Sequence, residues 1–287
     1  MLKNFYNFCM ENREQKFKQR GEMPKIDIFW NGIEEKVKNF FAEKIDEKVV
    51  ERMGYTPQEI EEKRRDAALR EQTFVKELLS EVQDARKENP EGDMLILFDI
   101  DDTIGRPKEN REAGKIDGTI LRPSILELLR HIREQYPNTR FGIISTRGLL
   151  QEQLQDEKWL APLKEFVDPN EVHSTKEWGE KLFRDFAEEE NIEKQKELSR
   201  RLKSWERGPG SSPHKIADYL RQHPEVEEAK IPEELSRWYP GDYLKMEIIK
   251  TKREANQDTT LIAVDDFEYP KFLKHGVCVY PDAMFYF

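Results

Sequence analysis

The 287-residue sequence has only two cysteines, Cys9 and Cys278, too few for a disulfide framework and without the spacing of a metal site. It contains no apolar run approaching the length of roughly 20 residues that a helix needs to cross a bilayer. The first residues also lack the pattern of a secretory signal. Basic residues are in deficit, and the net charge of −10 argues against non-specific binding to nucleic acid or anionic membranes. We therefore expect a cytoplasmic globular protein that does not contact membranes.

The first ninety residues are typical of helices without catalytic character. Apolar side chains between residues 33 and 49 recur at near-helical spacing. A second helix is expected to start after Thr56, because Thr56 and Glu59 form a capping box, and to end at residues 89–92. We assign residues 1–91 to a helical N-terminal extension that binds a protein partner or self-associates.

From residue 92 the pattern changes to strands that alternate with helices. Short apolar runs, typical of strands buried on both faces, occur at 94–98, 141–144, 261–264 and 276–280, with helical stretches at 124–135, 150–160 and 243–256. This alternation predicts an α/β fold with a doubly wound, mostly parallel sheet in a domain spanning residues 92–287. Within it, a charged amphipathic stretch at about 176–210 is expected to form a helical insertion.

Polar side chains follow three of these strands. Asp99 and Asp101 follow the first run, Ser145-Thr146-Arg147 the second, and Asp265-Asp266 the third. Ligand sites form beyond the carboxyl ends of parallel strands, so we expect these groups to converge. Taken singly, each has a structural explanation as a turn, a cap or a solvated side chain. Together they predict a phosphate site with Mg²⁺, a hard cation that prefers oxygen ligands and relieves repulsion between carboxylates.

Two lysines compete for a place beside these carboxylates. Lys245 stands near the start of a helix that leads directly into the strand ending before Asp265. Lys215 also begins a plausible helix, but it precedes Asp265 by 50 residues (265 − 215 = 50), with Pro224 and Pro232 between them. The single-helix connection favours Lys245.

These residues resemble the haloacid dehalogenase superfamily of phosphohydrolases. Its motifs occur in order, with the Asp-x-Asp-x-Thr loop at Asp99–Thr103, then Ser145, Lys245 and the acidic pair Asp265-Asp266. The resemblance spans roughly residues 94–287 and implies a Rossmannoid domain. Because only 37 residues (104–140) separate the first motif from the second strand, no large cap domain fits there.

Within that superfamily the sequence looks most like the phosphatase domain of polynucleotide kinase/phosphatases. The likeness is carried by Ser145-Thr146-Arg147 and by the segments 243–249 and 262–266. The P-loop of that family's kinase half is missing. This narrower resemblance implies nucleic-acid ends or nucleotides as phosphorylated substrates.

The resemblance also implies roles for individual residues in a Mg²⁺-dependent phosphomonoester hydrolase. Asp99 is the expected nucleophile, which forms an aspartyl-phosphate, and Asp101 the acid and then the base. Ser145 and Lys245 are expected to contact the transferring phosphoryl group, and Thr146 and Arg147 to bind the substrate phosphate. The expected Mg²⁺ ligands are Asp99, the carbonyl of Asp101 and one or both of Asp265 and Asp266.

Residues 105–119 are expected to form a short flap over this site. The segment 104–122 has five basic and three acidic residues, so Arg106 and Arg111, with Lys108 and Lys115, are expected to approach a bound anion. Three other functions stay open at this point: phosphotransfer to an acceptor other than water, hydrolysis of a small-molecule phosphate, and a non-catalytic binding module of the same fold.

Overall fold

The structure, a computed structural model, describes residues 23–44, 54–110, 115–148, 150–188, 241–266 and 273–279, and the single residues 192, 193, 196 and 270. The chain divides into two compact units. One holds the described residues up to Val82 together with Pro123–Leu128. The other holds Gln83–Arg122 and the described residues from Leu129 on. The division does not test the boundary at residue 91 that the sequence suggests, so that boundary stays a prediction.

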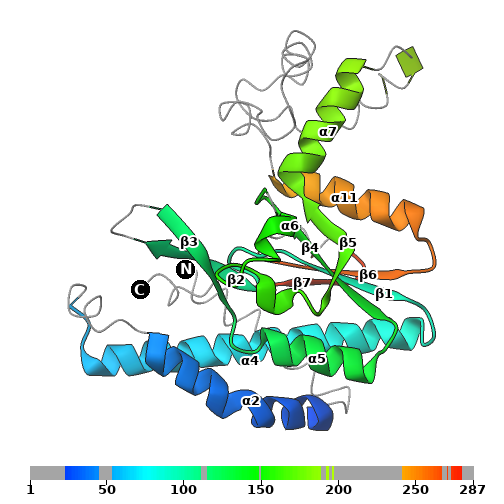
Figure 1. The fold of residues 1–287 in the computed structure, drawn as a ribbon. Helices are drawn as coiled ribbons and strands as arrows, with labels where there is room; N and C mark the ends of the chain where they lie inside the picture. Colours follow the sequence, from blue (N-terminus) through cyan, green and yellow to red (C-terminus); the bar gives the residue numbers. More distant parts are fainter. Residues whose placement is uncertain are drawn as a thin grey trace, which may run out of the picture. The chain divides into compact units, whose positions relative to one another are not determined.

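The first unit is helical. It contains α2 (Met23–Lys44) and most of α4 (Pro57–Glu88), drawn in blue and cyan in Figure 1. The expected capping box is present: the backbone N–H of Glu59 donates to Thr56 Oγ1 at 3.2 Å, and the N–H of Thr56 donates to Glu59 Oε2 at 2.7 Å. These two bonds satisfy N–H groups that the first turn of α4 would otherwise leave unpaired.

The second unit is built on a five-stranded sheet in which every neighbouring pair is parallel. The strand order is β5-β4-β1-β6-β7. Their bounds are β1 Met94–Phe98, β4 Thr139–Ser145, β5 Val167–Ser174, β6 Thr260–Asp265 and β7 Gly276–Cys278. The α/β class and the parallel sheet expected from the sequence are confirmed.

The strand order places a topological switch point at β1. From β1 the chain builds one side of the sheet with β4 and β5, and then returns to build the other side with β6 and β7. Phe98 pairs in register with Ile143 of β4 and with Val264 of β6, so the three strands end abreast. In sheets of this kind, the crevice beyond the carboxyl ends at the switch point is where ligands bind.

Helices cover both faces of this sheet. On one face, Ile248 and Ile249 of α11 (Gly241–Ala255) form an apolar cluster with Leu95 and Leu97 of β1. On the other face the guanidinium of Arg133, in α5 (Ile125–Gln135), lies 5.7 Å from the ring centre of Phe141. The alternation of side chains along a strand explains this division, since successive residues point to opposite faces. The helices expected at 124–135 and 243–256 are therefore present.

One expected helix is wrong, and one strand of the five-stranded sheet was missed. Instead of a helix over 150–160, α6 covers only Leu150–Gln153, and turns lead to the 3₁₀ helix η1 (Ala161–Leu163). The carboxylate of Asp156 accepts a hydrogen bond from the N–H of Lys158 at 2.9 Å, a local contact that competes with helical pairing. Strand β5 has no apolar run, because it is an edge strand with exposed polar residues.

The other segments that the sequence singled out are described in part. The expected flap is a two-stranded antiparallel hairpin of β2 (Gly105–Asn110) and β3 (Lys115–Leu121). Helix α7 (Thr175–Glu188) begins the stretch assigned to a helical insertion, most of which lies outside the described residues. None of the helices among the described residues is both long and apolar enough to pass through a membrane.

Candidate active site

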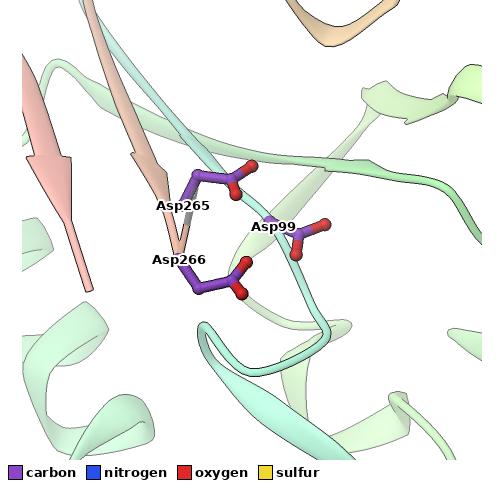
Figure 2. Close-up of side chains that lie close together, drawn as sticks. All are labelled: Asp99, Asp265 and Asp266. Atoms are coloured by element: carbon purple, nitrogen blue, oxygen red, sulfur yellow. The ribbon is translucent and has the colours of Figure 1, made fainter. Parts of the chain in front are cut away.

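Three carboxyl groups meet beyond the ends of β1 and β6. Asp99 comes directly after β1, Asp265 is the last residue of β6, and Asp266 follows it. The N–H of Asp99 donates to the carbonyl of Val264 at 2.9 Å, which holds the two strand ends together. Each aspartate has a carboxylate oxygen within 4.8 Å of those of the other two, and Figure 2 shows them gathered at the strand ends.

A buried lysine lies among these carboxylates. Lys245, near the start of α11, has its Nζ 2.7 Å from Asp265 Oδ2 and 3.1 Å from Asp99 Oδ1. Asp99 is 3% exposed, Asp265 0% and Lys245 4%, so the ion pairs are shielded from water. Three carboxylates around one ammonium leave an excess of negative charge at the site. Lys245 thus occupies the place that the sequence predicts, while Lys215 lies outside the described residues.

The pKa values of the cluster reflect this excess charge. Burial raises the pKa of Asp99 to about 7, with Asp265 adding to the rise and Lys245 opposing it. Burial and the neighbouring Asp265 likewise raise the pKa of Asp266 to about 7. Burial alone would lower the pKa of Lys245, but Asp99 and Asp265 together raise it above its ordinary value. These shifts favour protonated carboxyl groups in the cluster up to about neutral pH.

The cluster suits a small divalent cation. Its possible ligand atoms are all carboxylate oxygens, the donors that Mg²⁺ prefers, and they are close enough to share one ion. Two positive charges would also neutralise the charge that Lys245 leaves unbalanced. Asp99, Asp265 and Asp266 are therefore the residues that could hold the metal.

The carboxyl group of Asp101 is not among these possible ligands. Both of its oxygens are held by Arg147: Nε donates to Oδ2 at 2.9 Å and Nη2 to Oδ1 at 2.5 Å. The ligand expected from the sequence is the backbone carbonyl of Asp101 and not its carboxyl group, and that role stays a prediction. The pairing of Asp101 with Arg147 was not expected, because the sequence favoured a contact of Arg147 with the substrate phosphate.

The segment from Asp99 to Gly105 forms a tight turn. The carbonyl of Ile100 accepts hydrogen bonds from Thr103, Ile104 and Gly105 at 3.3, 3.2 and 3.0 Å. Asp102 has a φ of 60°, in the left-handed region that aspartate tolerates better than most residues. This turn brings Asp101 back towards the sheet edge that carries Asp99.

Two arginines brace this turn from the hairpin. Arg106 is buried, and its Nε lies 2.9 Å from Asp102 Oδ1. Arg122, which follows β3, donates from Nε to the carbonyl of Thr103. From the sequence, Arg106 was expected to approach a bound anion, but its guanidinium is paired with Asp102 of the turn. Arg111, the other arginine expected there, lies outside the described residues, and nothing in the sequence pointed to Arg122 as a brace.

The end of β4 supplies a hydroxyl group. Ser145 is the last residue of β4 and is fully buried, and the N–H of Arg147 lies 3.4 Å from its Oγ. Since Phe98 pairs with Ile143, Ser145 extends to the same sheet edge as Asp99. Thr146, the next residue, is exposed. The expected residues 99, 101, 145, 245, 265 and 266 therefore all lie at this edge.

Comparisons with protein-family models, with curated proteins and with solved structures gave no match.

Proposed function

We propose that this protein is a Mg²⁺-dependent phosphomonoester hydrolase that works through an aspartyl-phosphate. The observation that carries the proposal is the cluster of Asp99, Asp265 and Asp266 around Lys245 at the switch point of the sheet. A buried carboxylate beside both a cation site and an ammonium is well placed to react with a bound phosphate group, because its neighbours offset the charge that accumulates there.

In the first step, a carboxylate oxygen of Asp99 attacks phosphorus. The new O–P bond forms as the bond to the ester oxygen breaks, and Asp101 gives a proton to the departing oxygen. In the second step, water attacks the phosphorus of the aspartyl-phosphate. Asp101 takes a proton from that water, the Asp99 carboxylate leaves, and inorganic phosphate is released. Asp101 ends with the proton it gave, so the cycle is balanced.

Several residues support these steps by their position. Lys245, already in contact with Asp99, opposes the rise in the pKa of the nucleophile and so favours its ionised form, and it donates to a phosphoryl oxygen. The buried hydroxyl of Ser145 offers a further donor at the same edge. Mg²⁺ held by Asp99, Asp265 and Asp266 would supply positive charge that offsets the charge of the phosphoryl group.

The finer assignment of the fold belongs to the same proposal. A haloacid-dehalogenase-like domain without a large cap is supported by the order of the strands, the turn at residues 99–105 and the hairpin that follows it. The helices of the first unit are proposed as an extension of that domain. For substrate, the sequence favours a nucleotide or a nucleic-acid end.

The test is turnover of an aryl phosphate with and without Mg²⁺. We expect activity that excess chelator removes and Mg²⁺ restores, and that Asp99→Asn lowers by at least ~10³-fold, about 4 kcal/mol of barrier. Asp258→Asn is the matched control, since Asp258 is exposed at the opposite end of β6. Full activity in excess chelator, or in Asp99→Asn, would overturn the proposal.

A further inference from the structure

Arg147 is bound on both sides by the protein itself. One edge of its guanidinium, formed by Nε and Nη2, holds the two oxygens of Asp101. On the other side, Nη1 donates to Thr119 Oγ1 at 2.7 Å and lies 3.3 Å from Gln153 Oε1. The guanidinium carbon also lies 5.5 Å from the ring centre of Trp159. Residues from the turn that carries Asp101, from β3 and from the stretch 153–159 therefore hold one side chain in place.

This arrangement leaves Arg147 little capacity for a ligand. A guanidinium has five N–H groups, and four hydrogen bonds within the protein already engage Nε, Nη1 and Nη2. A bidentate contact with phosphate needs two N–H groups along one edge of the guanidinium, and Asp101 occupies the edge formed by Nε and Nη2. The Arg147 side chain is also only 11% exposed.

The orientation of the Asp101 carboxyl group, in contrast, is set by its two hydrogen bonds from Arg147. Its side chain is 34% exposed, and it sits in a turn rather than in a strand or helix. A carboxylate in such a place can rotate unless something holds it, and a bidentate guanidinium contact fixes both oxygens in one plane. An acid–base group must lie within hydrogen-bond reach of the atom it protonates, so this orientation bears directly on catalysis.

We propose that Arg147 is a positioning residue that acts through Asp101 and does not bind the substrate phosphate. It aims the Asp101 carboxyl group at the leaving oxygen. The hydrogen bond from Arg147 to Thr119 also connects the Asp101–Arg147 pair to β3, so the hairpin and the acid–base group are linked. The inference rests on the proposed phosphatase function, because it assigns Arg147 a part in the proton transfer of that reaction.

The experiment is a double-mutant cycle on two substrates. Wild type, Asp101→Asn, Arg147→Ala and the double variant are assayed with Mg²⁺ on 4-nitrophenyl phosphate, which needs little help from an acid, and on an alkyl phosphate, which needs much. We expect Asp101→Asn and Arg147→Ala each to lower kcat on the alkyl ester at least ~10-fold more than on the aryl ester. In the Asp101→Asn background, Arg147→Ala should change kcat less than ~2-fold, with KM unchanged.

Two further variants keep the result interpretable. Arg147→Lys keeps the positive charge but loses the fork, so it should show the same dependence on the leaving group even if Arg147→Ala fails to fold. Arg130→Ala is the control. Arg130 is exposed on α5, its Nη2 lies 4.0 Å from Glu165 Oε1, and it is distant in sequence from the turn that carries Asp101. It should leave both rates unchanged.

The outcomes separate the inference from the proposed function. If wild type hydrolyses neither ester with Mg²⁺, the proposed function fails and the inference with it. If wild type is active but Arg147→Ala lowers both rates equally, raises KM and adds its full effect to Asp101→Asn, Arg147 binds phosphate and the inference alone fails. It also fails alone if Asp101→Asn shows no dependence on the leaving group.

Discussion

Mg²⁺ should bind more tightly as the pH rises from 6 to 8. The metal-free site carries two carboxyl groups, Asp99 and Asp266, whose pKa values burial and the neighbouring Asp265 raise to about 7. At pH 6 a group with such a pKa is about 90% protonated and at pH 8 about 10%, so a cation must displace protons at the lower pH. Lys245 stays charged across this range, since its pKa lies above the ordinary lysine value.

The size of the effect follows from the number of protons displaced. If the two carboxyl groups share one proton, the apparent affinity rises about 10-fold between pH 6 and pH 8, or about 1.4 kcal/mol. If each binds its own proton, the rise is about 100-fold. The same shifts have a second consequence for the metal-free protein. The pKa values of Asp99 and Asp266 in the folded protein exceed the unfolded value near 4, so the folded state binds more protons between about pH 4 and pH 7. The free energy of unfolding of the metal-free protein should therefore fall as the pH rises through this range.

Isothermal titration with Mg²⁺ at pH 6, 7 and 8 measures the apparent affinity. Repeating the titration in buffers of different ionisation enthalpy gives the number of protons released. Asp266→Asn removes one titrating group and should flatten the dependence, while Asp258→Asn should leave it unchanged. An affinity independent of pH, or tighter at pH 6, would refute the reasoning.

Three other predictions concern the lysine, the substrate and the sheet. Lys245→Ala should lower kcat at least ~100-fold because it removes the ammonium beside Asp99, whereas Lys215→Ala should keep most activity; the reverse result would assign the role to residue 215. If oligonucleotides are substrates, KM for a terminal phosphate should hardly change with length beyond two or three nucleotides. The affinity should fall only weakly with salt, because the acidic chain contacts few phosphates and the logarithm of the binding constant falls by about 0.7 per phosphate contacted for each tenfold rise in salt; a steep slope would indicate a broad basic surface. Gly142→Ala should lower the free energy of unfolding by ~1–3 kcal/mol, because the added Cβ would lie 2.4 Å from the carbonyl oxygen of Glu171, whereas Gly32→Ala has open space and should be neutral or stabilising; equal melting temperatures for the two variants would contradict this.

The parts of the fold that the sequence could predict are those in which one residue pattern decides the structure. Residues 94–98 are apolar at every position, and the strand they form is buried on both faces. Strand β5 has no such pattern, since Asp168 and Glu171 lie in it beside Val167 and Val172. An edge strand needs only partial burial, so its sequence resembles that of a loop.

The candidate site divides in the same way. The meeting of Asp99 with Asp265 was predictable, because parallel strands end at a common edge of the sheet and both residues stand at strand ends. The pairing of Arg147 with Asp101 was not. These residues are 46 positions apart, and an arginine at a phosphate site suits a phosphate as well as a carboxylate. Only the turn at residues 99–105 places the Asp101 carboxyl group within reach of Arg147.

Trapping of the covalent intermediate tests the central claim most directly. The protein would be mixed with a ³²P-labelled phosphomonoester and Mg²⁺, quenched in acid within the first turnovers, and examined for label on the polypeptide. An aspartyl-phosphate predicts label that survives acid, is released by hydroxylamine, maps to the peptide carrying Asp99, and is absent from Asp99→Asn and from samples with excess chelator, while Asp258→Asn is labelled like wild type. Steady turnover without any hydroxylamine-sensitive label, or label that persists in Asp99→Asn, would contradict the account.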